Sequence, residues 1–188
     1  ALRSGNISVR HNNGFLITPS GKKYSSLKVK DIVFVSLDGK YEKKYKPSSE
    51  WRFHQDIYIK KKDAQAIVHT HSTNATALSV HKKSIPAFHY MVALAGGNDI
   101  KCAKYATYGT RELSKNILKA LNNRKACLIA NHGQIAFDKN LPDAFELAQE
   151  VENLSLQYIT ALKLGKPKIL SINEMNKVLK KAKNYKRG

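Results

Sequence analysis

Apolar and polar positions alternate in some segments of the chain and recur with a helical period in others. Short alternating or continuously apolar runs predict strands, which we expect at residues 6–10, 15–18, 31–37, 40–44, 66–71, 126–131 and 134–138. The pair Asn13-Gly14 between the first two runs suits a type I′ turn and predicts a hairpin. Because several of these strands follow each other after short turns, we expect a largely antiparallel sheet.

Longer segments with a helical period predict helices that flank this sheet. The expected helices are residues 47–61, 73–81, 110–123, 142–164 and 171–183. Capping residues mark several starts: Ser48 with Glu50 in the first turn, Thr110, and Ser171 with Glu174. The longest helix carries a broad apolar face that we expect to be buried, formed by Phe145, Leu147, Ala148, Val151, Leu154, Leu156 and Tyr158.

Composition and length are those of a soluble α/β domain. The 188 residues, 42% of them hydrophobic, suit one domain with a full core, which we place at residues 1–188. No run of about 18 apolar residues occurs, so no membrane span is predicted. The two cysteines, Cys102 and Cys127, form no CxxC pair and favour a reducing, cytoplasmic location. The chain opens at Ala1–Gly5 in a turn-like segment, and we expect a further helix to precede this numbering.

The charge of the chain is strongly positive. Lysine and arginine number 33 against 14 acidic residues, for a net charge of +19. The lysines are scattered, and no zinc finger, RNA-binding motif or basic–aromatic repeat accompanies them. A solvated lysine-rich surface therefore explains the charge better than nucleic-acid binding. The positive field would still attract a small phosphorylated substrate.

Two histidines end the apolar run 66–71, and their spacing suits a metal ion. Side chains alternate along a strand, so His69 and His71 lie on the same side, about 6–7 Å apart. His132 repeats this placement after the run 126–131, followed by Gly133, which permits a tight exit. Three imidazoles at one sheet edge match the ligand set of catalytic zinc. The alternative is that each histidine is a core or surface residue with an ordinary hydrogen bond.

Several donor-rich turns could bind an anion. Ser48 and Ser49 lie at a predicted helix start, where free N–H groups and the positive end of the helix dipole favour phosphate. Glu50 follows them and is a candidate carboxylate for the same site. The turns Gly5-Asn6 and Ser20-Gly21 also offer donors. The alternative is that the serines and Glu50 only cap the helix and that the glycines only turn the chain.

Seven short motifs follow one another along nearly the whole chain. They are Ser4–Arg10, Ile17–Gly21, Pro47–His54, Val68–His71, Ile85–Met91, Tyr105–Leu113 and Asn131–Gly133. Each is weak to moderate alone, but together and in this order they resemble the class II aldolase/epimerase family. The resemblance implies a three-layer α/β/α fold with a largely antiparallel central sheet. It also implies a zinc ion, or another divalent metal, held by Glu50, His69, His71 and His132.

The resemblance assigns further residues to the substrate. It implies phosphate binding by Asn6, Ser20, Gly21, Ser48 and Ser49. It implies a cyclic homotetramer with active sites between neighbours, into which Tyr90 reaches from the adjacent subunit. Tyr185 stands where the family has a tyrosine that closes over the substrate. Tyr108 and Ala182 replace a phenylalanine and a larger aromatic of the family, which leaves the aldehyde preference open.

The activity implied by the resemblance is reversible aldol cleavage. The substrate would be L-fuculose 1-phosphate or a related ketose 1-phosphate, and the products dihydroxyacetone phosphate and L-lactaldehyde. Glu50 would serve as base or acid, and Tyr90 would exchange the proton at the aldehyde oxygen. Two alternatives remain within the family: a pentulose 5-phosphate 4-epimerase, and a metal-free binding module like the adducin head. For His54, four residues after Glu50, we expect a supporting or structural role.

Overall fold

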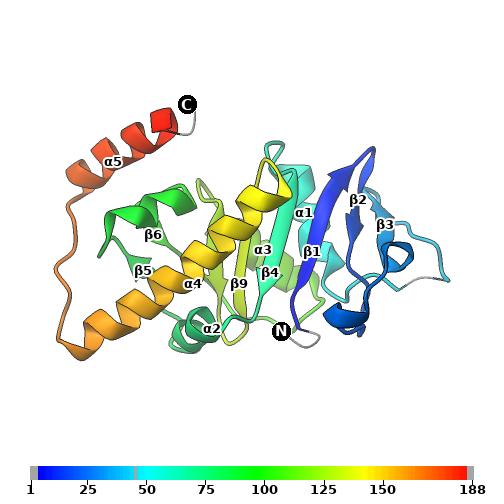
Figure 1. Cartoon of the computed structure of the whole chain (residues 1–188), viewed down its shortest axis with the longest axis horizontal. Helices are drawn as coiled ribbons and strands as arrows, with labels where there is room; N and C mark the ends of the chain where they lie inside the picture. Colours follow the sequence, from blue (N-terminus) through cyan, green and yellow to red (C-terminus); the bar gives the residue numbers. More distant parts are fainter. Residues whose placement is uncertain (1–3, 45, 186–188) are drawn as a thin grey trace.

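The computed structural model describes residues 4–44 and 46–185, with the side chains of 183–185 outside the description (Figure 1). The strands are β1 (Asn6–His11), β2 (Gly14–Ile17), β3 (Val33–Ser36), β4 (Ala66–Thr70), β5 (Ile85–Pro86), β6 (Asp99–Ile100), β7 (Cys102–Ala103), β8 (Ala126–Ile129) and β9 (Gly133–Asp138). The helices are α1 (Trp51–Lys60), α2 (Thr73–Val80), α3 (Arg111–Ala120), α4 (Leu141–Lys163) and α5 (Ile172–Tyr185), with 3-10 turns η1 (Tyr24–Ser26), η2 (Val29–Asp31) and η3 (Tyr90–Ala95). Among the helices described, none combines the length and apolarity needed to cross a membrane.

The central sheet is largely antiparallel, as the sequence predicts. Its seven strands are ordered β3-β2-β1-β4-β9-β8-β7, and only the edge pair β7–β8 is parallel. The short strands β5 and β6 pair separately. β4 occupies the middle position, so both of its edges are hydrogen-bonded, to β1 on one side and β9 on the other.

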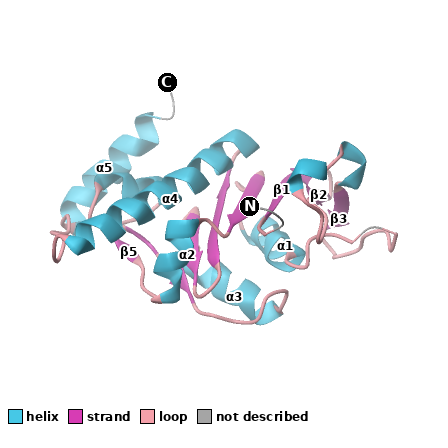
Figure 2. Ribbon diagram, turned by 60° about the horizontal axis from the view of Figure 1, so that its bottom comes forward, coloured by secondary structure: helices cyan, strands magenta, loops and turns pink. Residues whose placement is uncertain are grey.

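Helices cover both faces of the sheet and make three layers (Figure 2). The pleat of β4 sends Ile67 into a core shared with α1 and α3, and sends Ala66 and Val68 into a second core shared with α2 and α4. The second core extends under η3 and reaches Met175 of α5. The structure therefore confirms the α/β/α layering and gives each face its own apolar core.

One strand prediction and one turn prediction need correction. Residues 40–44 form no strand, because the Lys40 carbonyl accepts a hydrogen bond from the Ser36 N–H (3.0 Å) and closes a turn. The hairpin between β1 and β2 turns at Asn12-Asn13, with a φ of 48° at Asn12, while Gly14 lies inside β2. A Cβ on Gly14 would lie 2.3 Å from the Val35 carbonyl, so this glycine serves strand packing and not a type I′ turn.

The start of α1 also differs from the prediction. The helix begins at Trp51, with Glu50 at the N-cap position and no side-chain cap. Ser48 Oγ accepts from the Glu50 N–H (3.3 Å) ahead of the helix. The expected serine-capped helix from residue 47 is therefore wrong, and the Glu50 carboxylate is free to point away from the helix.

The long helix α4 buries only part of its predicted apolar face. Leu147, Val151 and Leu154 are buried, whereas Phe145 and Leu156 each keep 48% of their surface exposed. The exposed pair is eleven residues apart, about three helical turns, and lies on a separate stripe of α4. The predicted caps hold elsewhere, since Thr110 Oγ1 accepts from the Leu113 N–H and Ser171 Oγ from the Glu174 N–H.

Candidate metal and substrate site

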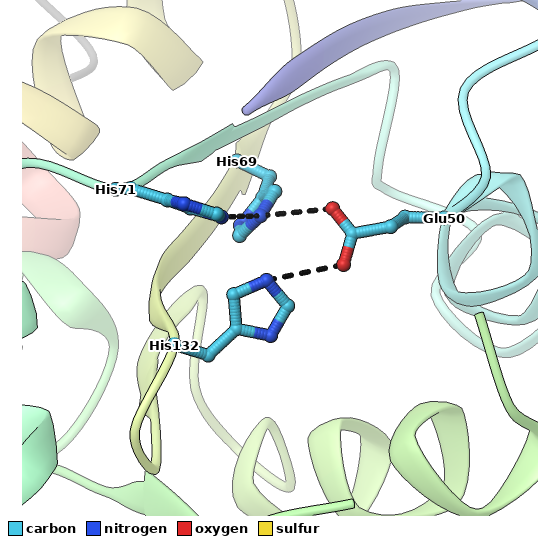
Figure 3. Close-up of side chains that lie close together, drawn as sticks. All are labelled: Glu50, His69, His71 and His132. Carbon is cyan, nitrogen blue, oxygen red and sulfur yellow. Dashed lines mark hydrogen bonds and ion pairs between the residues drawn. The ribbon is translucent and has the colours of Figure 1, made fainter. Parts of the chain in front are cut away.

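Four side chains from three parts of the chain converge at one end of the central strands (Figure 3). Glu50 precedes α1, His69 lies on β4, His71 follows it, and His132 lies on the turn between β8 and β9. One ligand atom from each residue can be chosen so that all four lie within 4.8 Å of one another. These are the four ligands that the family resemblance implies, and the fold brings them together.

Close backbone packing at this edge explains how the histidines meet. A Cβ on Gly133 would lie 2.3 Å from the Thr70 carbonyl, so only glycine lets β9 start against the end of β4. Gly5 lies on the other side of β4 and has a φ of 80°. The positive φ of the β8–β9 turn belongs to Asn131, at 54°, and not to Gly133. The glycine after His132 is therefore required for close approach, which corrects the predicted role in a tight exit.

The histidine rings present nitrogen lone pairs to a common point. His69 Nδ1 lies 2.8 Å from the Gln134 carbonyl, which can only accept, so Nδ1 carries the proton and Nε2 is free for a metal. His69 Nε2 lies 3.0 Å from His71 Nε2. Burial lowers the pKa of His71 to about 4, so its ring is neutral near pH 7. Two imidazole nitrogens facing each other at this distance fit a shared cation.

Glu50 completes the set with an ionised carboxylate. Its Oε2 lies 3.1 Å from His69 Nε2, and its Oε1 lies 3.1 Å from His132 Nε2. Burial acts to raise the pKa of Glu50, but the adjacent His132 and His69 outweigh it and hold the pKa well below its usual range. Oε1 is buried, yet it makes no hydrogen bond within the described residues. A buried carboxylate oxygen that faces an imidazole nitrogen and accepts no hydrogen bond from the described residues fits a divalent cation.

A cavity of about 340 Å³ opens beside this cluster. It is lined by Glu50, His71 and His132, by Tyr105 and Tyr108, and by all five residues predicted to bind phosphate, which are Asn6, Ser20, Gly21, Ser48 and Ser49. The structure thus places the predicted anion-binding turns and the metal ligands around one space. Sequence reasoning did not single out Tyr105, because it lies in a loop whose residues follow no period.

Two backbone turns form one side of the cavity and are tied together. The Ser48 N–H donates to the Thr18 carbonyl (3.1 Å), and the Ser20 N–H donates to the Lys46 carbonyl (3.0 Å). Within the described residues, the N–H groups of Gly21 and Ser49 donate to no other group. Together with the positive end of the α1 dipole, these two donors suit a phosphate.

Asn6 is held more tightly than a simple phosphate ligand requires. Its side chain is 3% exposed, and its Nδ2 donates to Glu50 Oε2 at 3.0 Å. Its Oδ1 lies 2.5 Å from His54 Nε2. The cavity wall and the metal ligands are therefore connected through this one amide.

The two predicted tyrosines lie apart from the cluster. Tyr90 starts η3, keeps 54% of its surface exposed, and lines cavities next to α4 and α5 in place of the metal-site cavity. The structure of one chain does not bring Tyr90 to Glu50. Tyr185 ends α5, and its side chain lies outside the described residues.

Comparison with known proteins agrees with this geometry. Residues 1–159 match the sequence profile of the family described as Class II Aldolase and Adducin N-terminal domain. The chain is 51% identical, over 97% of its length and 82% of the relative, to a 5-methylthioribulose-1-phosphate/5-deoxyribulose-1-phosphate aldolase of Rhodospirillum rubrum. It is also 51% identical, over 97% of its length and 85% of the relative, to an L-fuculose phosphate aldolase of Escherichia coli.

A solved structure confirms the fold. An L-fuculose 1-phosphate aldolase superposes with a TM-score of 0.93 at 41% identity, covering 97% of this chain and 87% of that one. The profile, the relatives and the superposition all agree with the motifs in the sequence. The chain therefore belongs to the class II aldolase and adducin N-terminal domain family.

Proposed function

We propose that this protein is a zinc-dependent aldolase that cleaves a ketose 1-phosphate reversibly. The products would be dihydroxyacetone phosphate and a small aldehyde. Membership of the family and the aldolases at 51% identity support lyase activity of the aldol type. The observation that carries the proposal is the cluster of Glu50, His69, His71 and His132 opening on a cavity with two free N–H donors.

The residues of the chain would divide the work. Gly21 and Ser49 would bind the phosphate, and Glu50, His69, His71 and His132 would hold the metal. When bound, zinc supplies Lewis acidity, which stabilises the negative charge left by cleavage of the C3–C4 bond. Glu50 is ionised and lies within the cavity wall, so it would add or remove the proton at C3. Zinc is favoured over a harder ion because three of the four ligands are imidazoles.

Two ketose phosphates compete for the role of substrate. L-Fuculose 1-phosphate would yield L-lactaldehyde, and 5-methylthioribulose 1-phosphate would yield an aldehyde with a thioether. The two relatives with these activities are equally similar to the chain. Both substrates share the phosphate half, so the difference would lie where the aldehyde half meets the cavity lining, which includes Tyr105 and Tyr108. We propose L-fuculose 1-phosphate or a close relative as substrate, with the deoxypentulose phosphates as the second candidate.

Closure of the site would involve a neighbouring chain. We propose a cyclic homotetramer in which Tyr90 of one subunit exchanges a proton with the aldehyde oxygen in the next. The exposure of Tyr90 and its distance from the cluster of its own chain support this arrangement. Tyr185 would cover the substrate from the C-terminal helix. A cytoplasmic location fits such an enzyme of sugar phosphate metabolism, with neither nucleic acid nor membrane as a partner.

One assay tests the function. Protein treated with chelator and protein reloaded with zinc are each given L-fuculose 1-phosphate, 5-methylthioribulose 1-phosphate or 5-deoxyribulose 1-phosphate, and released dihydroxyacetone phosphate is measured. We expect turnover only with metal, and fastest with L-fuculose 1-phosphate. Release that persists without metal, or no release from any ketose 1-phosphate, would overturn the proposal. L-Ribulose 5-phosphate tests the epimerase alternative, since its isomer would form without net aldehyde.

A further inference from the structure

A buried row of polar side chains runs from the core to the metal cluster. Tyr58 Oη lies 2.8 Å from Ser8 Oγ, and Ser8 Oγ lies 2.7 Å from His54 Nδ1. His54 Nε2 lies 2.5 Å from Asn6 Oδ1, and Asn6 Nδ2 lies 3.0 Å from Glu50 Oε2. Each of these residues is at most 6% exposed. Burying a continuous row of polar side chains is costly unless each one has a hydrogen-bond partner. Each bond in the row must therefore have a defined donor and a defined acceptor.

The ionised carboxylate at one end fixes the direction of every hydrogen bond in the row. Glu50 can only accept, so Asn6 must turn its NH₂ group toward Glu50 and its Oδ1 toward His54. Oδ1 can only accept, so His54 must carry its proton on Nε2. Nδ1 of His54 is then an acceptor and receives the hydroxyl proton of Ser8. Burial lowers the pKa of His54 to about 3, in agreement with a neutral ring.

The imidazole of His54 is clamped so that only its edges can bond. Its ring lies nearly parallel to Phe53, at 4.8 Å and 22°, and to Phe15, at 6.5 Å and 16°. Phe53 in turn contacts the His69 ring at 5.4 Å, edge to face. His54 lies four residues after Glu50, the N-cap residue of α1, and the Asn6 amide contacts both side chains. The ring therefore has a fixed orientation with respect to the metal ligands.

We propose that His54 is a positioning residue that sets the orientation of the Asn6 amide and, through it, the orientation of Glu50. An amide flip is nearly isosteric, and a flipped Asn6 would face Glu50 with an oxygen, so a donor on His54 is needed to exclude it. Asn6 then holds Glu50 Oε2 and leaves Oε1, which faces His132 Nε2 and accepts no hydrogen bond from the described residues, for the metal. The inference rests on the proposed function only for the metal-binding role of Glu50.

Two amide substitutions of equal charge separate the two edges of His54. In His54→Gln the side-chain amide extends about as far from the backbone as Nε2 of the imidazole, so it keeps a donor for Asn6. In His54→Asn it reaches only the depth of Nδ1, so it keeps an acceptor for Ser8 and loses the donor for Asn6. Both variants remove the ring from between Phe15 and Phe53, so the loss of packing is shared. A difference between them therefore reports the bond to Asn6.

Zinc affinity without substrate is the first measurement, by competition with a chromophoric chelator. We expect His54→Asn to bind zinc about 10- to 100-fold more weakly than His54→Gln, the usual loss when a group supporting a metal ligand is removed. Equal affinities of the two variants would overturn the proposal and leave His54 a packing residue. Because no substrate is used, the result does not depend on aldolase activity. No turnover in the unmodified protein, with the affinity difference intact, would count against the proposed function alone.

The tautomer of His54 supplies a second measurement, which is made on the unmodified protein and uses a variant only to assign the signals. In the metal-free protein labelled with ¹⁵N-histidine, we expect His54 near pH 7 as the neutral Nε2–H form with an unprotonated Nδ1. His54→Gln identifies its signals, because they disappear from the spectrum of the seven histidines. A proton on Nδ1, or a charged ring at pH 7, would overturn the proposal.

Discussion

The metal centre and the rim of its cavity differ in how completely one chain supplies them. At the centre, Glu50 is 6% exposed and His69 is 1% exposed, and the four ligands already converge. At the rim, Tyr105 and Tyr108 are 56% and 68% exposed. Tyr90, the residue proposed to handle the aldehyde, lies outside the cavity of its own chain. The candidate metal centre thus lies at strand ends and includes two buried ligands, Glu50 and His69, whereas the rim consists of exposed loop residues.

This difference agrees with the pattern among relatives. Two aldolases of equal identity to the chain are named for different ketose phosphates. The phosphate half of those substrates is the same, and the aldehyde half differs. We infer that changes at the rim can alter specificity while the centre keeps its chemistry. Substitutions at the centre should therefore cost more activity than substitutions at the rim.

The largest effect is expected at the centre from Glu50→Gln. The three imidazoles remain, so the variant should bind zinc more weakly but still be loaded when zinc is in excess, whereas kcat should fall about 10³-fold because the ionised base is lost. Metal content and dihydroxyacetone phosphate release are measured on the same preparation. Glu42→Gln, an exposed carboxylate, is the matched control and should be unaffected. Normal turnover in Glu50→Gln would remove this residue from the mechanism.

A smaller effect is expected from Tyr90→Phe, at the residue proposed to complete the site of a neighbouring subunit. Loss of the phenol proton should lower kcat about 100-fold, the lower end for a general acid, with zinc affinity unchanged. Tyr41→Phe, another exposed tyrosine, serves as control.

Co-expression of Tyr90→Phe with Glu50→Gln tests whether Tyr90 of one subunit and Glu50 of its neighbour act in the same site. In mixed oligomers, on the order of a quarter of the sites would combine an unmodified Glu50 from one subunit with an unmodified Tyr90 from its neighbour, and these sites would regain activity. Mixed preparations as inactive as the parents would place Tyr90 and Glu50 in one chain's site, or outside catalysis.

A third prediction concerns the phosphate turn between centre and rim. Ser49→Ala removes a hydroxyl donor next to the free N–H, so KM should rise about 10-fold, equivalent to ~1.5 kcal/mol for one charge-assisted hydrogen bond. Inhibition by inorganic phosphate should weaken by the same factor. Ser26→Ala, which changes an exposed serine in η1, is the control. An unchanged KM would show that the Ser49 hydroxyl does not bind the phosphate.

The smallest effect is the pH dependence of stability in the metal-free protein. The pKa of His54 is lowered to about 3 from an ordinary value of 6.5, so the unfolded chain binds more protons between these values. The contribution of His54 to the free energy of unfolding is therefore fully present above pH 6.5 and is lost as the pH falls below that value. Denaturant unfolding at pH 7.5, 6.5 and 5.5 measures the slope. His54→Gln should show a shallower slope, and identical slopes would contradict the assignment.

The sequence predicts well those parts of the fold where local pattern and tertiary packing agree. The buried runs of β4 and β8 and the capped start of α3 at Thr110 are examples. Prediction fails where a distant contact decides. Residues 97–104 show no strand period, yet β6 and β7 form there because β5 and β8 supply partners. The exposure of Phe145 and Leu156 likewise depends on which stripe of α4 meets the sheet.

The candidate site divides in the same way. The spacing of His69 and His71 predicts that both lie on one side of a strand, but the pair alone leaves open whether they bind a metal, and His132 is needed to favour one. Glu50 is ambiguous in the sequence, since a carboxylate at a helix start is usually a cap. Only the packing of α1 against β4 shows that it faces the histidines. No local pattern in the sequence predicts that the Asn6 amide contacts both Glu50 and His54.

The middle position of β4 determines how the loaded site would lose its metal. Three strands lie on each side of β4, so local opening around His69 would break hydrogen bonds to both β1 and β9. Backbone amides of such a strand exchange with solvent only when the whole sheet unfolds. His71 is the exposed member of the ligand set. The residence time of the ion would then be set by how often the His71 imidazole rotates into solvent. A chelator could empty the site while amide exchange in β4 stays as slow as before.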